Sequence, residues 1–193
     1  MVDVRLATTR DRERVVESVS LAFHGDPAWD FILGAGACDA AAAFARVLFD
    51  ARAGRGTVWV ADDGAAVAMW DRVDVTRGDG VTDDIWARFR AAVGERVWAS
   101  LWAYDEAVKA SGPARPYWYL GVLATHPDRQ GEGLATAVLR PGTAAADAEG
   151  WDCWLETSKP ANKAFYASRG YVESIPVADL DGPPTWWLRR PSH

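Results

Sequence analysis

Histidine and cysteine are scarce in this sequence. Three histidines (His24, His126 and His193) and two cysteines (Cys38 and Cys153) lie far apart along 193 residues. No spacing among them is typical of a zinc site, so we expect no bound metal. Two isolated cysteines also give no disulfide framework, and we therefore expect reduced thiols and a cytoplasmic location.

Long hydrophobic runs are absent as well. No apolar stretch approaches the roughly 20 residues that a membrane-spanning helix needs, and the first residues do not resemble a signal peptide. The chain also lacks an excess of positive charge, since its formal net charge is −6. Because binding to nucleic acid needs a basic surface, we expect neither a nucleic-acid nor a membrane partner. The acidic balance suits a cationic small substrate.

Tryptophan, in contrast, is abundant. The chain contains 11 tryptophans, and some of them must belong to the core of a domain of this length. So large an aromatic area also favours a pocket for a planar or hydrophobic ligand. We assign Trp29, Trp98 and Trp102 to such a substrate pocket. Tryptophans on the surface could equally form the interface of a homodimer, so this alternative stays open.

Strands and helices alternate along the chain without repeats or linker composition. The patterns predict strands at 2–6, 57–61, 65–70, 117–125, 152–156, 171–177 and 185–189. They predict helices at about 8–23, 40–53, 82–110, 131–149 and 161–168. We expect the helix at 82–110 to break at Gly94, and the helix at 131–149 to kink or break at Pro141-Gly142. The sequence therefore predicts one mixed α/β domain over residues 1–193.

A glycine-bearing turn follows the strand predicted at 117–125. It reads Gln130-Gly131-Glu132-Gly133-Leu134-Ala135 and leads into an apolar helix. The first backbone N–H groups of a helix lack internal partners, and the helix dipole adds positive potential there. Glycine lets the main chain approach a bulky anion without a Cβ atom in the way. We therefore predict that this turn binds a pyrophosphate.

The turn differs from two familiar glycine fingerprints. It lacks the G-x-G-x-x-G spacing of dinucleotide-binding folds and the Gly-Lys-Ser/Thr end of a nucleotide triphosphatase loop. Its pattern, Q-x-x-G-x-A, resembles the pyrophosphate motif of the GNAT superfamily of acetyl-CoA-dependent N-acetyltransferases. The resemblance implies a single GNAT-type domain whose mixed central sheet has splayed strands and is flanked by helices. It also implies a cofactor-binding core at about 117–178 and acetyl-CoA as the acyl donor.

Two side chains downstream of this motif also point to chemistry. Asn162 and Tyr166 are four residues apart, so both project from one face of the helix predicted at 161–168. The surrounding segment, 161–171, matches the GNAT pattern. The resemblance implies that Asn162 holds the pantetheine end of the cofactor and that Tyr166 protonates the departing thiolate. A phenol with a pKa of about 10 can donate this proton without being ionised at neutral pH.

Glu156, at the end of the strand predicted at 152–156, is the candidate general base. Attack by an amine requires the loss of a proton, and a carboxylate in a closed cleft can have its pKa raised toward the useful range. The sequence leaves open whether Glu156 acts directly, acts through a water, or only pairs with Lys159 or Lys163.

The GNAT resemblance also implies roles for the residues around the motif. It implies that a backbone N–H near Leu123 stabilises the oxyanion and that Leu123 and Thr125 bond the pantetheine. The residues that it assigns to the pyrophosphate are Gln130, Gly131, Gly133, Leu134 and Ala135.

The resemblance extends beyond the cofactor half. The chain is similar nearly end to end to the puromycin N-acetyltransferase family, in stretches that include 58–68, 127–131 and 155–158. It departs from that family at 28–39 and about 71–115, the segments that line the acceptor site of this fold. We therefore expect acetyl transfer to a primary amine of a small, aromatic or antibiotic-like molecule, by direct attack in a ternary complex. The alternatives are an acyl-CoA-binding sensor without turnover and a protein N-terminal or lysine acetyltransferase.

Overall fold

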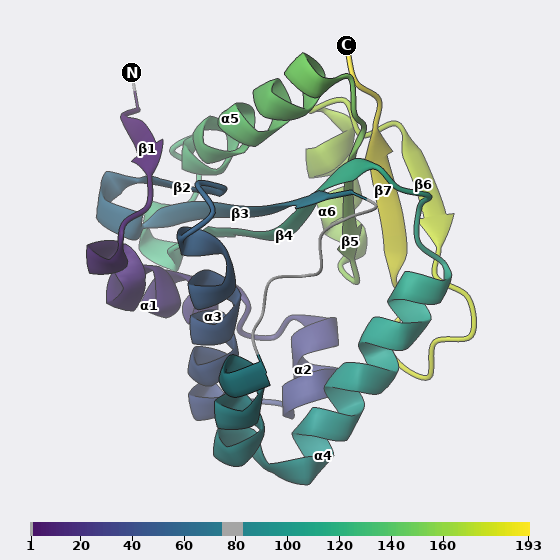
Figure 1. The fold of residues 1–193 in the computed structure, drawn as a ribbon. Helices are drawn as coiled ribbons and strands as arrows, with labels where there is room; N and C mark the ends of the chain where they lie inside the picture. Colours follow the sequence, from purple (N-terminus) through teal and green to yellow (C-terminus); the bar gives the residue numbers. More distant parts are fainter. Residues whose placement is uncertain (1, 75–82) are drawn as a thin grey trace.

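A seven-stranded mixed β-sheet organises the computed structural model, which describes residues 2–74 and 83–193 (Figure 1). The strands lie in the order β1-β2-β3-β4-β5-β7-β6, and only the pair β4–β5 is parallel. Their bounds are β1 Val4–Leu6, β2 Val58–Ala61, β3 Ala66–Val73, β4 Tyr117–Thr125, β5 Cys153–Thr157, β6 Glu173–Pro176 and β7 Trp186–Arg190. Each strand overlaps one predicted segment, and the predicted mixed α/β class is confirmed.

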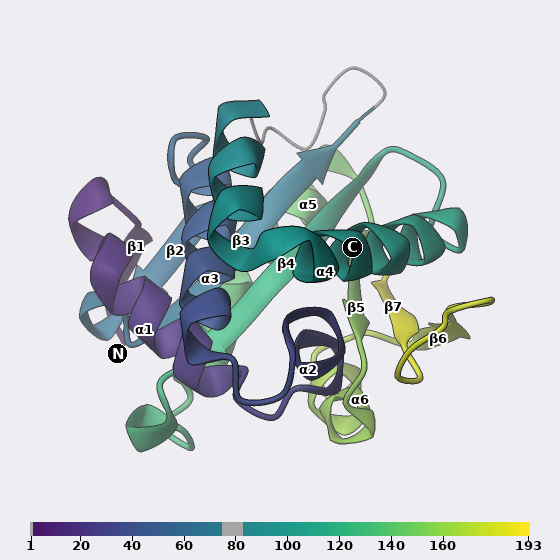
Figure 2. The same ribbon diagram turned by 90° about the horizontal axis from the view of Figure 1, so that it is seen from below.

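Six α-helices of the described chain cover the two faces of the sheet (Figures 1 and 2). They are α1 Arg12–Ala22, α2 Pro27–Leu33, α3 Cys38–Ala53, α4 Asp83–Ala110, α5 Leu134–Glu149 and α6 Pro160–Ala167. Side chains of α1 to α4 form one apolar core with the sheet, and those of α5 and α6 form a second core on the opposite face. Short 3₁₀ turns also occur at 9–11, 62–64 and 127–129.

Helix α2 is an element that the sequence analysis missed. Asp26 caps its first turn by accepting hydrogen bonds from the backbone N–H groups of Ala28 and Trp29, and Pro27 occupies the first helical position. Both features favour a helix start. The helix has only seven residues, too few to show a clear period in the sequence, and burial of Trp29 and Ile32 holds it in place.

Gly94 bends α4, as the sequence predicts. Its φ of 78° and ψ of 171° lie in a region that is open almost only to glycine. The two halves of α4 therefore meet at an angle and do not form one straight rod (Figure 2).

Helix α5 runs through Pro141 as one helix, so of the kink or break predicted at Pro141-Gly142 the break is wrong. Gly142 lies directly against β3, where a Cβ atom would come within 2.2 Å of the Trp70 indole. Proline has no backbone N–H, so Pro141 cannot donate a helical hydrogen bond. The close packing of the helix on the sheet offsets the loss of that bond. The helix also begins at Leu134, three residues later than predicted, because Gly133 has a left-handed backbone and caps it.

A bulge in β4 changes which side chains face each core. Met69 of β3 lies opposite Val122, whereas the next residue, Trp70, lies opposite Leu120. Gly121 is therefore the extra residue of the bulge. Leu120 joins the core beneath α5, and Val122 joins the opposite core although it lies only two residues further along the strand.

Strands β4 and β5 are joined at only two positions, Trp118 with Cys153 and Tyr119 with Trp154. Beyond Tyr119 no further pair links them in the described part of the chain. Strand β5 pairs along its whole length with β7 instead. The centre of the sheet is thus splayed, as the GNAT resemblance predicts.

No single helix within residues 2–74 and 83–193 is long and apolar enough to cross a membrane. Helices α2 and α3 satisfy that test of length and composition only as a pair, and a bend of 105° separates them. Both helices contribute side chains such as Trp29 and Phe44 to the core on one face of the sheet.

We expect Gly142→Ala to lower the free energy of unfolding by about 2 kcal/mol, because the new methyl group would overlap the buried Trp70 ring. Denaturant titration followed by circular dichroism measures this change. Gly54→Ala is the matched control, since Gly54 has an α-helical backbone and open space around its Cβ position. Equal stability of the two variants would contradict the close packing of α5 on β3.

Candidate active site

A cavity of about 370 Å³ lies where β4 and β5 part. Its walls come from both sides of the sheet. Tyr119 and Trp187 belong to the core shared with α1 to α4, whereas Leu120 and Tyr166 belong to the core shared with α5 and α6. The cavity therefore reaches through the gap in the sheet, where groups arriving from opposite faces can meet.

Glu156 of β5 is half-buried as a residue and lines this cavity. Its Oε1 accepts a hydrogen bond of 2.8 Å from the Tyr119 hydroxyl, while Oε2 is buried without a hydrogen-bond partner among the described residues. Burial raises the pKa of Glu156 to about 7, and the hydrogen bond from Tyr119 opposes this shift only in part. The carboxyl group can therefore take up or release a proton near neutral pH.

Further charged groups from three elements lie near Glu156. Arg52 of α3 donates two hydrogen bonds, of 2.9 and 2.6 Å, to Asp71 of β3. Arg52 lowers the pKa of Glu156, whereas Asp105 of α4 raises it, both less than burial does. A Cβ atom at Gly121 would come within 2.9 Å of the Arg52 guanidinium. The bulge glycine therefore makes room for a cation in the wall of the cavity.

Tyr166 of α6 also lines the cavity. Its ring packs edge-on against Phe165 and Tyr171, with centroid distances of 5.1 and 5.3 Å. Burial raises the pKa of Tyr166 above its ordinary value, so the phenol keeps its proton at neutral pH. Asn162, one helical turn earlier, lines the same cavity and donates a hydrogen bond of 3.0 Å to Thr157 Oγ1.

The two lysines near Glu156 in the sequence have other partners. Lys159 lies 3.6 Å from an Asp26 carboxylate oxygen, and Lys163 lies over the Trp186 ring at 3.5 Å. Neither pairs with Glu156 in the part of the chain that the structure describes. The carboxylate is therefore not neutralised by a lysine of α6 or of the turn before it.

The predicted pyrophosphate turn leads into α5 with an unusual backbone. Gly131 and Gly133 have positive φ angles of 82° and 80°, a conformation that glycine adopts readily. A Cβ atom at either position would meet no atom within 4 Å, so open space lies beside the turn. Gln130 ties the turn to the end of β4 through a hydrogen bond of 3.4 Å to the Thr125 carbonyl. A bulky anion fits this arrangement.

The other predicted cofactor residues lie along the same side of the sheet. Leu123 lines the cavity, and Thr125 is buried at the end of β4. Leu134 is buried in the core, and Ala135 is half-buried in the first turn of α5. The predicted oxyanion position near Leu123 lies four residues beyond Tyr119, the last residue of β4 that pairs with β5.

Arg169 is a cation near the turn that the sequence analysis missed. It donates hydrogen bonds of 3.1 and 2.6 Å to Thr136 Oγ1 in the first turns of α5, and its guanidinium stacks on Phe165 at 3.5 Å. Positive charge thus lies beside the helix start that is expected to bind phosphate. No local pattern marks this residue, because its contact with Thr136 joins positions that are 33 residues apart in the sequence.

The structure separates the predicted substrate tryptophans. Trp29 of α2 and Trp102 of α4 line the same cavity as Glu156. Trp98 does not line this cavity, and instead lies in a second, more open pocket on α4. Trp98 and Trp102 lie in the same half of α4 with ring centroids 5.3 Å apart, but only Trp102 also lines the central cavity, so the three residues do not form one wall.

Tyr119, the partner of Glu156, is another residue that the sequence analysis missed. It pairs with Trp154 across β4 and β5, and Glu156 lies two residues beyond Trp154 on the same face of β5. The contact depends on the register of two strands that are distant in the sequence. The sequence predicts a strand at 117–125, but a strand prediction does not specify a partner.

Residues 54–173 of the chain match the acetyltransferase (GNAT) domain family. This match spans more than half of the chain and includes the turn, the gap in the sheet, Glu156 and Tyr166. The chain belongs to the GNAT acetyltransferase family. It is therefore an acetyltransferase, and acetyl-CoA is its acyl donor.

Solved structures of acetyltransferases share this fold over the whole chain. One is described as histone acetyltransferase HPA2 and related acetyltransferase from Corynebacterium glutamicum, with a TM-score of 0.70, 24% identity, and coverage of 100% of this chain and 97% of that one. The polyamine N-acetyltransferase of Drosophila melanogaster has a TM-score of 0.72, 13% identity, and coverage of 99% and 100%. The arylalkylamine N-acetyltransferase 2 of Aedes aegypti has a TM-score of 0.65, 12% identity, and coverage of 100% and 99%. At these identities the similarity shows a common fold and leaves the acceptor of this GNAT acetyltransferase open.

We expect Glu156 to make this acetyltransferase less stable as the pH rises. Its folded-state pKa of about 7 is above that of an exposed glutamate, about 4.3, so the native state binds more protons between these values. The free energy of unfolding therefore falls as the pH rises through this window. Relative to the wild type, Glu156→Gln should gain about 1–3 kcal/mol between about pH 5 and about pH 8.

Denaturant titrations across this pH range measure the difference. Glu106→Gln is the control, because it removes the same charge from an exposed position on α4. A pH-independent difference between Glu156→Gln and the wild type would show that the carboxyl group titrates normally.

Proposed function

We propose that this chain transfers the acetyl group of acetyl-CoA to a primary amine of a small molecule, by direct attack in a ternary complex. The observation that carries the proposal is the cavity through the gap in the sheet, which Glu156 and Tyr166 both line. One residue is an acid that titrates near neutral pH, and the other is a buried neutral phenol. A base and an acid on one cavity are what amine acetylation requires.

Glu156 acts as the base in this proposal. With a pKa of about 7, a large fraction of the group is a carboxylate at neutral pH and can accept the proton of the attacking amine. Tyr119 occupies Oε1 through its hydrogen bond. Oε2, buried and without a partner among the described residues, is the atom that we assign to the proton, directly or through a water.

Tyr166 acts as the acid. Acetyl-CoA supplies a thioester, whose carbonyl carbon is attacked by the amine and whose C–S bond then breaks to release a thiolate. The buried phenol of Tyr166 is neutral at the pH at which Glu156 is partly ionised, so it can donate a proton to that sulfur. A backbone N–H of β4 near Leu123 is our candidate for stabilising the oxyanion.

The acetyl-CoA site in this proposal lies within about residues 117–178. The pyrophosphate lies at the start of α5, against the turn from Gln130 to Ala135, whose glycines leave open space. The cation of Arg169 lies beside it. The pantetheine runs toward the gap along β4, near Leu123, Thr125 and Asn162.

The acceptor is an aromatic or hydrophobic amine of the antibiotic class in this proposal. Trp29, Trp102 and Tyr104 supply aromatic walls to the cavity, and Asp26 and Asp105 supply carboxylates. The similarity to the puromycin N-acetyltransferase family supports such an acceptor and a role in antibiotic resistance. Structural neighbours named as polyamine and arylalkylamine N-acetyltransferases also support a small-molecule amine. A cytoplasmic location, a homodimer, and the lack of nucleic-acid and membrane partners stay predictions.

Acetyl-CoA-dependent release of free thiol, measured over a panel of amines, tests this function. The panel contains puromycin, aminoglycosides, aromatic amines, amino acids and a lysine peptide. Turnover of a small amine supports the proposal. Turnover of the peptide alone would make the chain a protein acetyltransferase, and binding of acetyl-CoA without turnover of any amine would favour a sensor.

We expect Tyr166→Phe to lower kcat by about 100-fold or more with little change in the affinity for acetyl-CoA, because the acid is lost and the ring is kept. Steady-state kinetics and calorimetric titration measure the two quantities. Tyr171→Phe is the matched control: Tyr171 packs against Tyr166, but it does not line the cavity. An unchanged kcat in Tyr166→Phe would remove this residue from the mechanism.

We expect Gly133→Val to weaken acetyl-CoA binding by about tenfold or more, since a β-branched side chain would strain the turn and enter the space left for the pyrophosphate. Gly150→Val imposes a similar left-handed strain at the opposite end of the same helix, where φ is 69°. Calorimetric titration of both variants with acetyl-CoA separates the two effects. Equal affinities would mean that the pyrophosphate binds elsewhere.

A further inference from the structure

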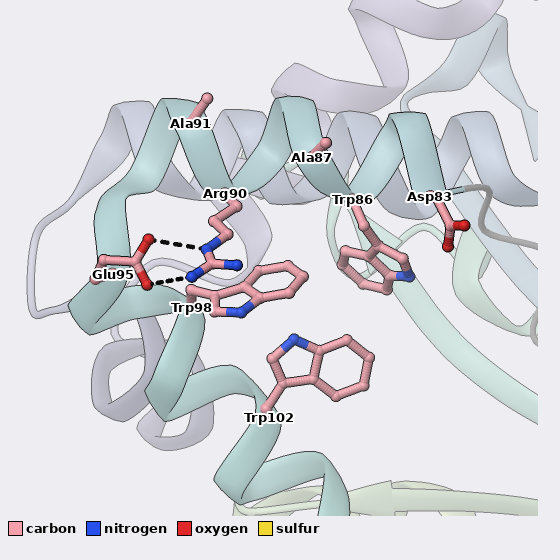
Figure 3. Close-up of a pocket in the computed structure, with 8 residues that line it drawn as sticks. All are labelled: Asp83, Trp86, Ala87, Arg90, Ala91, Glu95, Trp98 and Trp102. Carbon is pink, nitrogen blue, oxygen red and sulfur yellow. Dashed lines mark hydrogen bonds and ion pairs between the residues drawn. The ribbon is translucent and has the colours of Figure 1, made fainter.

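Three tryptophans of α4 line an outer pocket beside the central cavity (Figure 3). Trp86 comes from the first half of the helix, and Trp98 and Trp102 come from the second half. The ring centroids lie 5.8 Å apart for Trp86 and Trp98, 5.5 Å for Trp86 and Trp102, and 5.3 Å for Trp98 and Trp102. The three rings thus form one aromatic surface that turns toward the hollow.

The bend at Gly94 builds this pocket. In a straight helix, Trp86 and Trp98 would lie 12 residues apart along one rod, or roughly 18 Å. The non-helical backbone of Gly94 folds the second half back, so that the two rings come into contact. The resulting hollow has a volume of about 700 Å³, which is large enough for an aromatic ring system.

The charges at the outer pocket disfavour an anionic ligand. Arg90 lies over the Trp98 ring at 5.4 Å, but its guanidinium donates hydrogen bonds of 2.8 and 2.7 Å to Glu95 (Figure 3). The carboxylate of Asp83 adds a negative charge to the rim. A neutral or cationic aromatic ring therefore suits this pocket better than a phosphate or a carboxylate.

The outer pocket adjoins the cavity that Glu156 lines. Trp86 and Trp102 line both hollows, whereas Trp98 lines only the outer one. The rings are also half-buried and face a concavity, unlike an apolar surface that projects into solvent. Shared walls and concave shape point to a single extended ligand.

We propose that the outer pocket binds the aromatic ring of an elongated acceptor, whose primary amine reaches Glu156 in the central cavity. This inference rests on the proposed acetylation of a small amine and adds that the acceptor carries an aromatic group separated from the amine by a spacer. Trp98 is then a specificity residue. It contacts the ring of the acceptor and lies away from the reacting atoms.

The test compares phenylalkylamines of increasing chain length with n-alkylamines of the same lengths as acceptors. In the wild type, the phenyl group should lower KM at one optimal length. In Trp98→Ala we expect this lowering of KM by the phenyl group to shrink about tenfold while kcat stays unchanged, because the phenyl ring loses one of the aromatic side chains that it contacts. Trp98→Phe should retain most of this lowering of KM, and thermal unfolding of each variant checks that it is folded.

Trp59→Ala is the matched control, because Trp59 is a half-buried tryptophan of β2 that lines neither hollow. Calorimetric titration with the corresponding phenylalkanols gives a readout that needs no turnover, and binding should weaken in Trp98→Ala only. If no amine is acetylated but Trp98→Ala binds phenylalkanols more weakly, the proposed function is wrong and the aromatic binding site is supported.

Two results would overturn the inference. In the first, both the wild type and Trp98→Ala acetylate amines, and the two proteins prefer the phenylalkylamines over the n-alkylamines to the same degree. The second is a change in sedimentation of Trp98→Ala from dimer to monomer without any change in that preference, which would make the tryptophan surface an interface between copies of the chain.

Discussion

The parting of β4 from β5 is the constraint on which the rest of this structure depends. Two adjacent parallel strands normally continue their hydrogen bonds, yet here pairing stops after Tyr119. The bulge at Gly121 turns β4 at this point, and β7 satisfies the other edge of β5. Each strand keeps one full partner, so the sheet tolerates the gap. The gap in turn gives side chains from both cores access to one cavity.

That cavity explains why the acidic and phenolic groups of the site differ from their exposed counterparts. Removing Glu156 from water favours its neutral form, and the Tyr119 hydroxyl only partly compensates because it reaches one of the two carboxylate oxygens. Burial favours the protonated phenol of Tyr166 in the same way. A single physical cause, burial at a break in the sheet, therefore brings the pKa of Glu156 near neutral pH and keeps the Tyr166 phenol protonated.

Much of this arrangement could be predicted because its signals are local. The run from Tyr117 to Thr125 was readable as a strand, and the turn before Leu134 was readable as a helix start, from neighbouring residues alone. The contact of Tyr119 with Glu156 was not, since it depends on pairing between distant strands. The same limit applies to Trp98, whose type suggested a ligand pocket but whose place follows from the path of α4 after its bend.

The contact between Gly142 and Trp70 has a consequence for how this sequence can change over time. The indole occupies the space that any side chain at position 142 would need. A larger residue at 142 is compatible with the fold only after a smaller one has replaced Trp70, so the two positions, 72 residues apart, are expected to vary as a pair. Helix α5 and the central sheet thus depend on one contact, and the residues allowed at either position are limited by the residue at the other.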